Sequence, residues 1–439
     1  MGSSAREDSL ISPFGVIADV IAIQAPRGLP QLSSFRAPVG SGKPGSGTHR
    51  LAMAGMGYAM ASPDRARKIA ISEAVERYSS GDFASTEYLE ASAAELSGDC
   101  LDLATLPRCS PAEYADPRCP LIPADPHAKI RWLEGWDLAT AAPVWVPAVM
   151  GCYRLDKPWP QERFWHQIST GYAVHPDPRE ALVQGICEII ERDAIALLWL
   201  QKLAFPRTSL RDYARWEASG AAAGEAFADL QTVLTWSQRH YVETYLFDAT
   251  TDIGIPTVYC MQVAEHDSHG HQLVGCGTSR TLVQAARKAI MECVQLRRAF
   301  HALGDTPADP EEFHEFTDGG HYMGARERAS AFTFLFDRSR AVTHGYRREL
   351  PDDSADALTS LVDALAAKNM RVIAVDRTSR DLTTAGLTAV AVFVPALQPM
   401  SFHPFSQYKG HERLMLGPAA MGVPALAEEE LNPWPQPFM

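Results

Sequence analysis

The chain has 439 residues, of which 46% are hydrophobic and 21% charged, and its formal net charge is −13. This composition is typical of a soluble globular protein of one large domain or two to three smaller ones. The net charge argues against nucleic acid as the main partner, because phosphate backbones are bound by clustered Lys and Arg. No apolar run is long enough for a membrane helix, and the eight scattered cysteines include no C-x-x-C pair typical of zinc sites.

The N-terminal segment is polar and lacks the apolar core of a signal peptide. We therefore expect a disordered leader over residues 1–10 and a cytoplasmic protein. Residues 13–24 follow as a predicted strand region. The loop at 38–47 contains Gly-Ser-Gly-Lys, but Pro44 follows Lys43 where a P-loop requires Ser or Thr. We interpret this loop as a flexible linker.

Three helices are predicted from N-terminal capping signals spaced about a hundred residues apart. Ser62 precedes a proline at the first helical position. Asp177 and Glu180 have the spacing of a capping box, and Thr281 and Gln284 repeat that spacing. Each start follows a short stretch that contains glycine. The sequence therefore predicts a diverged internal strand–helix repeat.

Each predicted helix carries an acidic residue 11 positions after its cap, and a second polar residue follows three positions later. In order, these residues are Glu73 and Glu76, Glu188 and Glu191, and Glu292 and Gln295. Side chains at this spacing share one helix face, where two carboxylates repel each other. Two readings are open: solvated faces with ordinary Glu–Arg pairs, or a site for a divalent cation. The repetition at one distance from three caps favours Mg²⁺ together with phosphate oxygens.

Two cations accompany these acids. Arg192 directly follows the second pair and could neutralise it. Lys288 stands one turn before Glu292 and could contact a phosphate, although a single lysine there is also what an ordinary helix surface has.

The remaining chain predicts alternating helices and strands, so we expect a mixed α/β or α+β fold. Residues 84–165 read as short strands and loops, and 303–330 as a loop rich in Gly and acids. Strands are predicted at 241–249, 255–265, 272–277, 370–376 and 387–395, and an amphipathic helix at 356–368.

Four stretches resemble the YcaO family: ISEAVERYS at 71–79, STGYAV…EALVQGICEIIERDA at 169–194, ECVQLR at 292–297 and DRTSRDLTTAGLTAVAVFVPALQP at 376–399. The resemblance implies the YcaO type of ATP-binding fold, with one domain at 11–430 and a Pro-rich tail at 431–439. Family members bind Mg²⁺-ATP and use it to phosphorylate a peptide backbone amide oxygen.

The resemblance also implies roles for single residues. Metal binding is assigned to Glu73, Glu76, Glu188, Glu191 and Glu292, and nucleotide binding to Glu180, Arg192, Lys288 and Gln295. The chain departs from the family at three places: Lys288 stands where other members have arginine, Pro176 where some have asparagine, and Ala396 where glycine is usual.

The C-terminal residues form a P-x-P-x-P pattern with Pro433, Pro435 and Pro437 before Met439. A polyproline segment could simply dock on a partner. Azoline-forming YcaO proteins have a similar tail that reaches the active site. By this resemblance, the three prolines would carry the Met439 carboxylate to a fixed point, where it would act as a base.

The implied activity is ATP-dependent cyclodehydration of Cys, Ser or Thr in a ribosomal precursor peptide to thiazoline or oxazoline. The implied partners are that peptide, a protein resembling ubiquitin-activating enzymes that supplies a peptide-binding module, and an FMN dehydrogenase, with a homodimer left open. Two alternatives remain: thioamide or amidine formation or assistance in ribosomal-protein modification, and a non-catalytic nucleotide-binding subunit.

A histidine cluster lies outside this scheme. His266, His269 and His271 could hold a metal by their spacing, but they fall on a predicted hairpin turn. We interpret them as part of a solvated turn.

Overall fold

The computed structural model describes residues 8–24, 28, 30, 32–40, 54–81, 86–96, 100–220, 222–300, 307–343 and 347–438. The chain forms two compact units. Unit 1 comprises Met1–Thr105, Leu121–Ile186 and Arg371–Val394, and unit 2 comprises Leu106–Pro120, Cys187–Met370 and Pro395–Met439. The expected division into leader, domain and tail stays a prediction.

Unit 1 contains two sheets whose strands pair antiparallel throughout the described residues. The first has the order β1-β2-β3, and the second β4-β5-β12-β13-β7 with β6 paired to β5. The strands are β1 (Ile21–Ile23), β2 (Leu32–Pro38), β3 (Ala54–Met60), β4 (Leu89–Ala91), β5 (Ile130–Asp137), β6 (Pro143–Pro147), β7 (Tyr172–His175), β12 (Ile373–Asp376) and β13 (Thr388–Phe393). The helices are α2 (Pro63–Ser79), α4 (Ala148–Gly151) and α11 (Arg380–Ala385), with short 3₁₀ turns η2 (Leu103–Thr105) and η3 (Pro160–Glu162).

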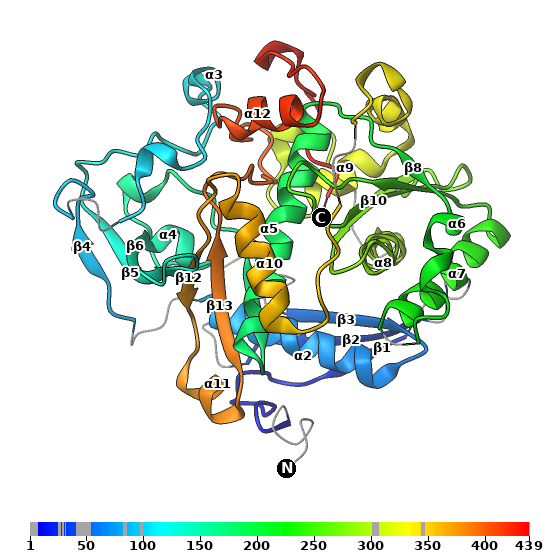
Figure 1. Cartoon of the computed structure of the whole chain (residues 1–439), viewed down its shortest axis with the longest axis horizontal. Helices are drawn as coiled ribbons and strands as arrows, with labels where there is room; N and C mark the ends of the chain where they lie inside the picture. Colours follow the sequence, from blue (N-terminus) through cyan, green and yellow to red (C-terminus); the bar gives the residue numbers. More distant parts are fainter. Residues whose placement is uncertain are drawn as a thin grey trace. The chain divides into compact units, whose positions relative to one another are not determined.

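Helix α2 packs closely on β3 because the strand has two glycines where it meets the helix (Figure 1). A β-carbon on Gly55 would lie 2.1 Å from the Ala70 carbonyl oxygen, and one on Gly57 would lie 1.9 Å from that of Ala66. The helix presents small residues to the strand, and Ala66 and Ala70 are fully buried. Close approach of the two backbones therefore requires glycine on one side and alanine on the other.

Unit 2 is built on one antiparallel sheet of order β11-β10-β9-β8. Its strands are β8 (Arg207–Thr208), β9 (Glu243–Asp248), β10 (Thr257–Val263) and β11 (Gln272–Thr278). Its helices are α3 (Pro111–Ala115), α6 (Leu210–Tyr213), α7 (Ala222–Arg239), α8 (Leu282–Phe300), α9 (Asp318–Gly324), α10 (Ser354–Ala366) and α12 (Arg413–Ala420). The 3₁₀ turns are η4 (Ala214–Trp216), η5 (Pro310–Glu312), η6 (Arg326–Phe336), η7 (Arg338–Arg340) and η8 (Glu428–Glu430). Helix α5 (Pro178–Leu200) begins in unit 1 and ends in unit 2.

The two faces of this sheet are covered differently. Helix α8 packs on one face, where β-carbons on Gly275 and Gly277 would lie 2.3 and 2.4 Å from carbonyl oxygens of the helix. The opposite face carries Tyr259 and Cys276, which belong to a hydrophobic core with Trp199 of α5. The glycine-to-helix packing of β3 and α2 thus recurs in β11 and α8.

The predicted helix starts and the mixed helix–sheet class are confirmed. The Ser62 hydroxyl accepts a hydrogen bond from the Arg65 N–H at 3.4 Å, and the Asp177 carboxylate accepts one from the Arg179 N–H at 2.9 Å. Thr281 and Gln284 form the reciprocal capping box. Caps depend on a few adjacent residues, which is why sequence reasoning located them.

Two local predictions need correction. Within 13–24 the strand is confined to β1, because residues 10–17 turn back on themselves through the bond from the Ile17 N–H to the Leu10 carbonyl. The predicted loop at 303–330 contains α9, η5 and the start of η6, since Tyr322 and Met323 pack into the core of unit 2. Residues 1–7 and 41–47 lie outside the described residues, so the predicted leader is not tested, although Leu10 at its end is buried.

Among the helices that the structure describes, none combines the length and the hydropathy needed to cross a bilayer.

Burial of His411 in unit 2 makes stability depend on pH. The side chain is 5% exposed, and desolvation, followed by the charges of Arg108 and Arg413, lowers the pKa of His411 to about 4. Between this value and the unfolded value near 6.5, the unfolded chain binds more protons than the folded chain. Stability is therefore lost as the pH falls from about 6.5 to about 4, by up to about 3 kcal/mol.

Urea unfolding across this pH range tests the effect. The His411→Gln variant cannot titrate there, so its free energy of unfolding is expected to decline less steeply than that of the wild type. Parallel pH profiles for the two proteins would contradict the assignment.

Candidate active site

The free edge of β11 organises the site in unit 2. Within the described residues β11 is the outermost strand of its sheet, so alternate N–H groups point away from β10. The Cys276 N–H donates to the Glu292 carboxylate at 2.8 Å, and the Thr278 N–H donates to the Glu191 carboxylate at 2.7 Å. Glu292 comes from α8 and Glu191 from α5, so this strand edge brings together acids from two helices.

Glu292 carries a strongly perturbed carboxyl group. Desolvation, followed by repulsion from Glu191, raises its pKa to about 7, against the opposing effects of Arg192, the Cys276 N–H and Lys288. The two acids are therefore electrostatically coupled. A bound cation would favour the ionised form of Glu292.

Lys288 of α8 holds the same strand end. Its ammonium group lies 3.4 Å from Glu191 Oε2 and donates to the Thr278 carbonyl at 3.1 Å. The Lys288 side chain is 48% exposed, so part of it is open to solvent. Lys288 thus combines a fixed position with access to a ligand.

Arg192 is the second cation of the cluster. It pairs with Glu188 one turn earlier at 3.2 Å. Desolvation lowers the pKa of Arg192, but the negative charges of Glu188, Glu191 and Glu292 outweigh this effect, so the pKa is raised overall. Its buried Nε has no hydrogen-bond partner among the described residues. An arginine with spare donors beside carboxylates is suited to a phosphate oxygen.

Unit 1 holds a second acidic cluster of similar design. The Met56 N–H of β3 donates to the Glu73 carboxylate at 2.8 Å, and Arg77 pairs with Glu73 at 3.2 Å. Burial lowers the pKa of Arg77, but Glu73 and then Glu76 outweigh it, so the value is raised. β3 is an outermost strand of its described sheet, as β11 is. In both places an N–H group of an edge strand donates to a glutamate of the adjacent helix.

The other predicted nucleotide contacts lie near these clusters along the chain. Glu180 belongs to unit 1, where Gln184 donates to it at 3.4 Å. Gln295 is half-buried on α8, three residues after Glu292. Their roles at the nucleotide stay predictions.

The Pro-rich segment is an integral part of unit 2. The Trp434 carbonyl accepts a hydrogen bond from the Trp199 indole at 3.0 Å, and the buried Phe438 packs edge-on against Tyr259 with ring centroids 5.8 Å apart. Pro433 is exposed, whereas Pro435 and Pro437 are buried. Met439 lies outside the described residues, so its assignment as base stays a prediction.

The histidine turn is only partly as expected. His266 and His269 are exposed, but His271 is 4% exposed. The neighbouring Gln272 donates to the carbonyls of Met323 and Ala325, which closes that segment over the turn and buries His271. The interpretation as a solvated turn is therefore wrong for His271.

Sequence reasoning missed the residues that hold the acids. The N–H groups of Cys276 and Thr278 could not be recognised, because a backbone donor has no sequence signature. The buried pair of Asp193 and Arg413 was also missed. Arg413 contacts Asp193 at 2.7 Å and Asp252 at 2.7 Å, and this anchors the helix turn after Arg192.

The donor set fits Mg²⁺ beside a phosphate ligand. Within the described part of unit 2, the cluster has three carboxylates and two cations, and Glu292 shows the raised pKa of a desolvated acid. Mg²⁺ takes oxygen ligands and is commonly held by one or two carboxylates together with phosphates. No group of three or more His, Cys, Asp or Glu side chains in the described ranges is arranged to hold a metal ion. Glu191 and Glu292 would therefore each supply one carboxylate ligand to Mg²⁺.

A substitution at Lys288 tests the phosphate contact. Lys288→Met removes the ammonium and is expected to raise the KM for ATP by about 10- to 100-fold, because a charge-assisted hydrogen bond is lost. Lys288→Arg keeps the charge and serves as the control, with a KM within about threefold of the wild type. Steady-state ATP hydrolysis measures both; an unchanged KM in Lys288→Met would exclude the contact.

The chain is similar to a known protein family and to a curated protein. The family model described as YcaO cyclodehydratase, ATP- and Mg²⁺-binding, matches residues 56–398. An uncharacterized protein in the tfuA 3′ region of Rhizobium leguminosarum bv. trifolii is 30% identical over 203 residues, which are 45% of this chain and 43% of that protein. The chain thus spans less than half of this curated relative.

Two solved structures share the fold. A heterocyclase in complex with substrate and cofactor superposes with a TM-score of 0.80 at 22% identity, covering 99% of this chain and 57% of that chain. The E. coli microcin synthetase McbBCD complex with pro-MccB17 bound gives 0.60 at 14% identity, with 96% of each chain covered. Since the family model spans well over half of the sequence, including the glutamates of α2, α5 and α8, the chain belongs to the YcaO family.

Proposed function

We propose that the protein is an ATP-dependent cyclodehydratase subunit that acts on the backbone amides of a peptide. The observation that carries the proposal is the cluster at the β11 edge, where Glu191 and Glu292 are fixed by backbone N–H groups beside two cations. A fixed, desolvated set of charges is what phosphoryl transfer needs, since catalysis there consists largely of positioning and charge neutralisation. Membership of an ATP- and Mg²⁺-binding family supports this use of the cluster.

In the proposed site, the carboxylates would bind the metal and the cationic side chains would bind the phosphates. Glu191 and Glu292 would hold Mg²⁺, which would neutralise charge on the phosphate oxygens. Lys288 and Arg192 would contact those oxygens directly. We propose that Glu188 also contributes a carboxylate to this site and that Gln295 contacts the nucleotide. In unit 1, we propose Glu73 and Glu76 as metal ligands and Glu180 as a nucleotide-binding residue.

The proposed reaction conserves all atoms. The thiol or hydroxyl of a Cys, Ser or Thr side chain attacks the preceding amide carbonyl carbon and loses its proton. The resulting oxyanion takes the γ-phosphoryl group of ATP, and ADP leaves. Expulsion of the amide oxygen as inorganic phosphate, with loss of the nitrogen-bound proton, forms the C=N bond of the azoline. The peptide loses one water for each ring.

We propose that the protein works with partners, namely a precursor peptide and a separate protein with a peptide-binding module. The McbBCD complex with pro-MccB17, which shares the fold, supports an assembly of this kind. An FMN dehydrogenase would oxidise azoline to azole. Pro433, Pro435 and Pro437 are proposed to shape the peptide end of the site; Pro435 and Pro437 are buried, whereas Pro433 is exposed.

Mass spectrometry of the peptide product tests the function. The protein is incubated with Mg²⁺-ATP and the peptide and partner encoded beside it. Loss of one water per modified residue, dependent on ATP, is expected. Exchange of oxygen for sulfur would instead establish thioamide formation, and ATP binding without any change in peptide mass would establish a non-catalytic subunit.

A further inference from the structure

The last residue of β11 connects the acidic cluster to a buried row of hydroxyl groups. Thr278 donates its N–H to Glu191 and accepts from Lys288 through its carbonyl. Its hydroxyl lies 2.7 Å from that of Thr257, the cross-strand neighbour on β10. Both threonines are no more than 1% exposed. The position of Thr278, and therefore of Glu191 and Lys288, depends on this buried contact.

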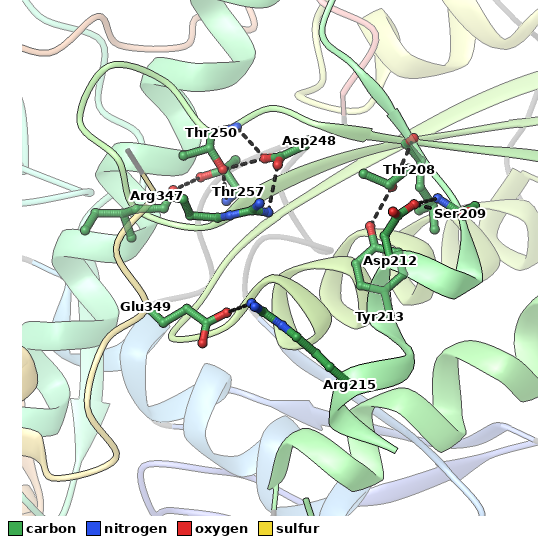
Figure 2. A network of polar contacts seen from close by, with 12 residues as sticks. Thr208, Ser209, Asp212, Tyr213, Arg215, Asp248, Thr250, Thr257, Arg347 and Glu349 are labelled. Atoms are coloured by element: carbon green, nitrogen blue, oxygen red, sulfur yellow. Dashed lines mark hydrogen bonds and ion pairs between the residues drawn. The ribbon is translucent and has the colours of Figure 1, made fainter. Parts of the chain in front are cut away.

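The row continues across the end of the sheet, as Figure 2 shows in part. The Thr257 N–H donates to the Thr250 hydroxyl at 3.2 Å, and that hydroxyl donates to the Asp248 carboxylate at 2.6 Å. Arg347 pairs with the other oxygen of Asp248 at 2.8 Å. Asp248 and Thr250 are 6% and 5% exposed. The row is therefore buried and ends on a charged pair.

The hydroxyl groups of the row are satisfied within the sheet. The Thr257 hydroxyl lies 3.1 Å from the Ile255 carbonyl oxygen, to which it can donate, and either hydroxyl of the Thr257–Thr278 pair can be the donor. Thr250 accepts from the Thr257 N–H and donates to the Asp248 carboxylate. A connected row of buried hydrogen bonds holds its members in one arrangement.

We propose that Asp248, Thr250 and Thr257, held by Arg347, are positioning residues of the nucleotide site. They fix the backbone of Thr278, and through it the Glu191 carboxylate and the Lys288 ammonium. The inference rests on the proposed function, because it assumes that these two groups bind Mg²⁺-ATP. Groups that orient a ligand-binding side chain are worth about 10- to 100-fold in affinity.

The same sheet offers a matched control, also visible in Figure 2. At its other edge the Thr208 hydroxyl lies 2.7 Å from the Tyr213 hydroxyl and donates to the Leu246 carbonyl. This pair has the same O···O distance as the Thr257–Thr278 pair and is half-buried, but Thr208 lies on β8, the opposite edge strand from β11. Loss of a threonine hydroxyl contact elsewhere in the sheet can therefore be separated from loss of positioning.

Calorimetric titration with Mg²⁺ and a non-hydrolysable ATP analogue tests the proposal. Thr257→Val keeps shape and volume but removes the hydroxyl, and about tenfold weaker binding is expected. Thr257→Ser restores the hydroxyl and is expected to bind within about twofold of the wild type. Thr278→Val deletes the same hydrogen bond from its other end and replaces Thr257→Val should that variant fail to fold. Thr208→Val is expected to bind like the wild type.

The outcomes separate this inference from the proposed function. Wild-type affinity in Thr257→Val and Thr278→Val would overturn the positioning role while leaving the nucleotide site intact. Equal weakening in Thr208→Val would also overturn it, since the effect would then be one of general stability. A wild-type chain that does not bind the analogue would overturn both. KM and kcat for ATP provide a second readout, because misplacement of binding groups is expected to raise KM more than it lowers kcat.

Discussion

Replacing Glu191 by Gln is expected to reduce peptide-dependent ATP turnover by about 100-fold or more. Glu191 is buried, with 6% of the residue exposed, and its carboxylate accepts from the Thr278 N–H and from Lys288. Glutamine has the same shape, so the fold is preserved while the negative charge is lost. Loss of a metal ligand removes several kcal/mol of charge stabilisation in the transition state, and each 1.4 kcal/mol is tenfold in rate.

The control is an exposed glutamate of the same unit. Glu217 lies on the surface after η4, so Glu217→Gln makes the same chemical change away from the site. It is expected to keep wild-type turnover. Circular dichroism and thermal unfolding should show both variants folded. Turnover of Glu191→Gln within about threefold of the wild type would refute the site at the β11 edge.

The Gly277→Ala variant is expected to destabilise unit 2 strongly. The new β-carbon would lie 2.4 Å from the Ala285 carbonyl oxygen and 2.6 Å from Lys288 Cβ, well inside contact distance. Helix α8 would have to move away from β11, which exposes core surface and withdraws Glu292 from the Cys276 N–H. We expect a loss of about 3 kcal/mol in the free energy of unfolding, together with loss of nucleotide binding.

A second glycine in the same unit should respond in the opposite direction. Gly224 lies in α7, and the nearest atom to an added β-carbon is 3.5 Å away. Alanine favours the helix there, so Gly224→Ala is expected to stabilise unit 2 by about 0.5 kcal/mol. Urea unfolding measures both. Equal effects of the two substitutions would mean that backbone entropy, rather than collision with α8, governs Gly277.

Local signals in the sequence were sufficient to find the helices and the acids. The caps at Ser62, Asp177 and Thr281 fix three helix starts, because capping involves neighbouring residues only. The spacing from cap to glutamate then assigns one face to each acidic pair. These features are encoded within one or two helical turns.

Features that depend on distant parts of the chain were not predictable. The Glu191 carboxylate is held by Thr278, 87 residues away, and Asp193 by Arg413, 220 residues away. The 303–330 region appeared loop-like because its glycines disfavour helix, yet burial of Tyr322 and Met323 outweighs that preference. A single sequence gives no information on such pairings, because the type of one residue does not identify its distant partner.

The repeated packing of glycine strands on helices has a consequence for how chain length can vary. Glu73 follows its backbone donor Met56 by 17 residues, whereas Glu292 follows Cys276 by 16. The cap-to-glutamate spacing is the same 11 residues, so the difference lies in the connection between strand and helix. The two connections therefore differ by one residue while each glutamate still reaches its backbone donor. A single insertion inside α2 or α8 would instead turn every later side chain by about 100° and remove the carboxylate from the strand edge.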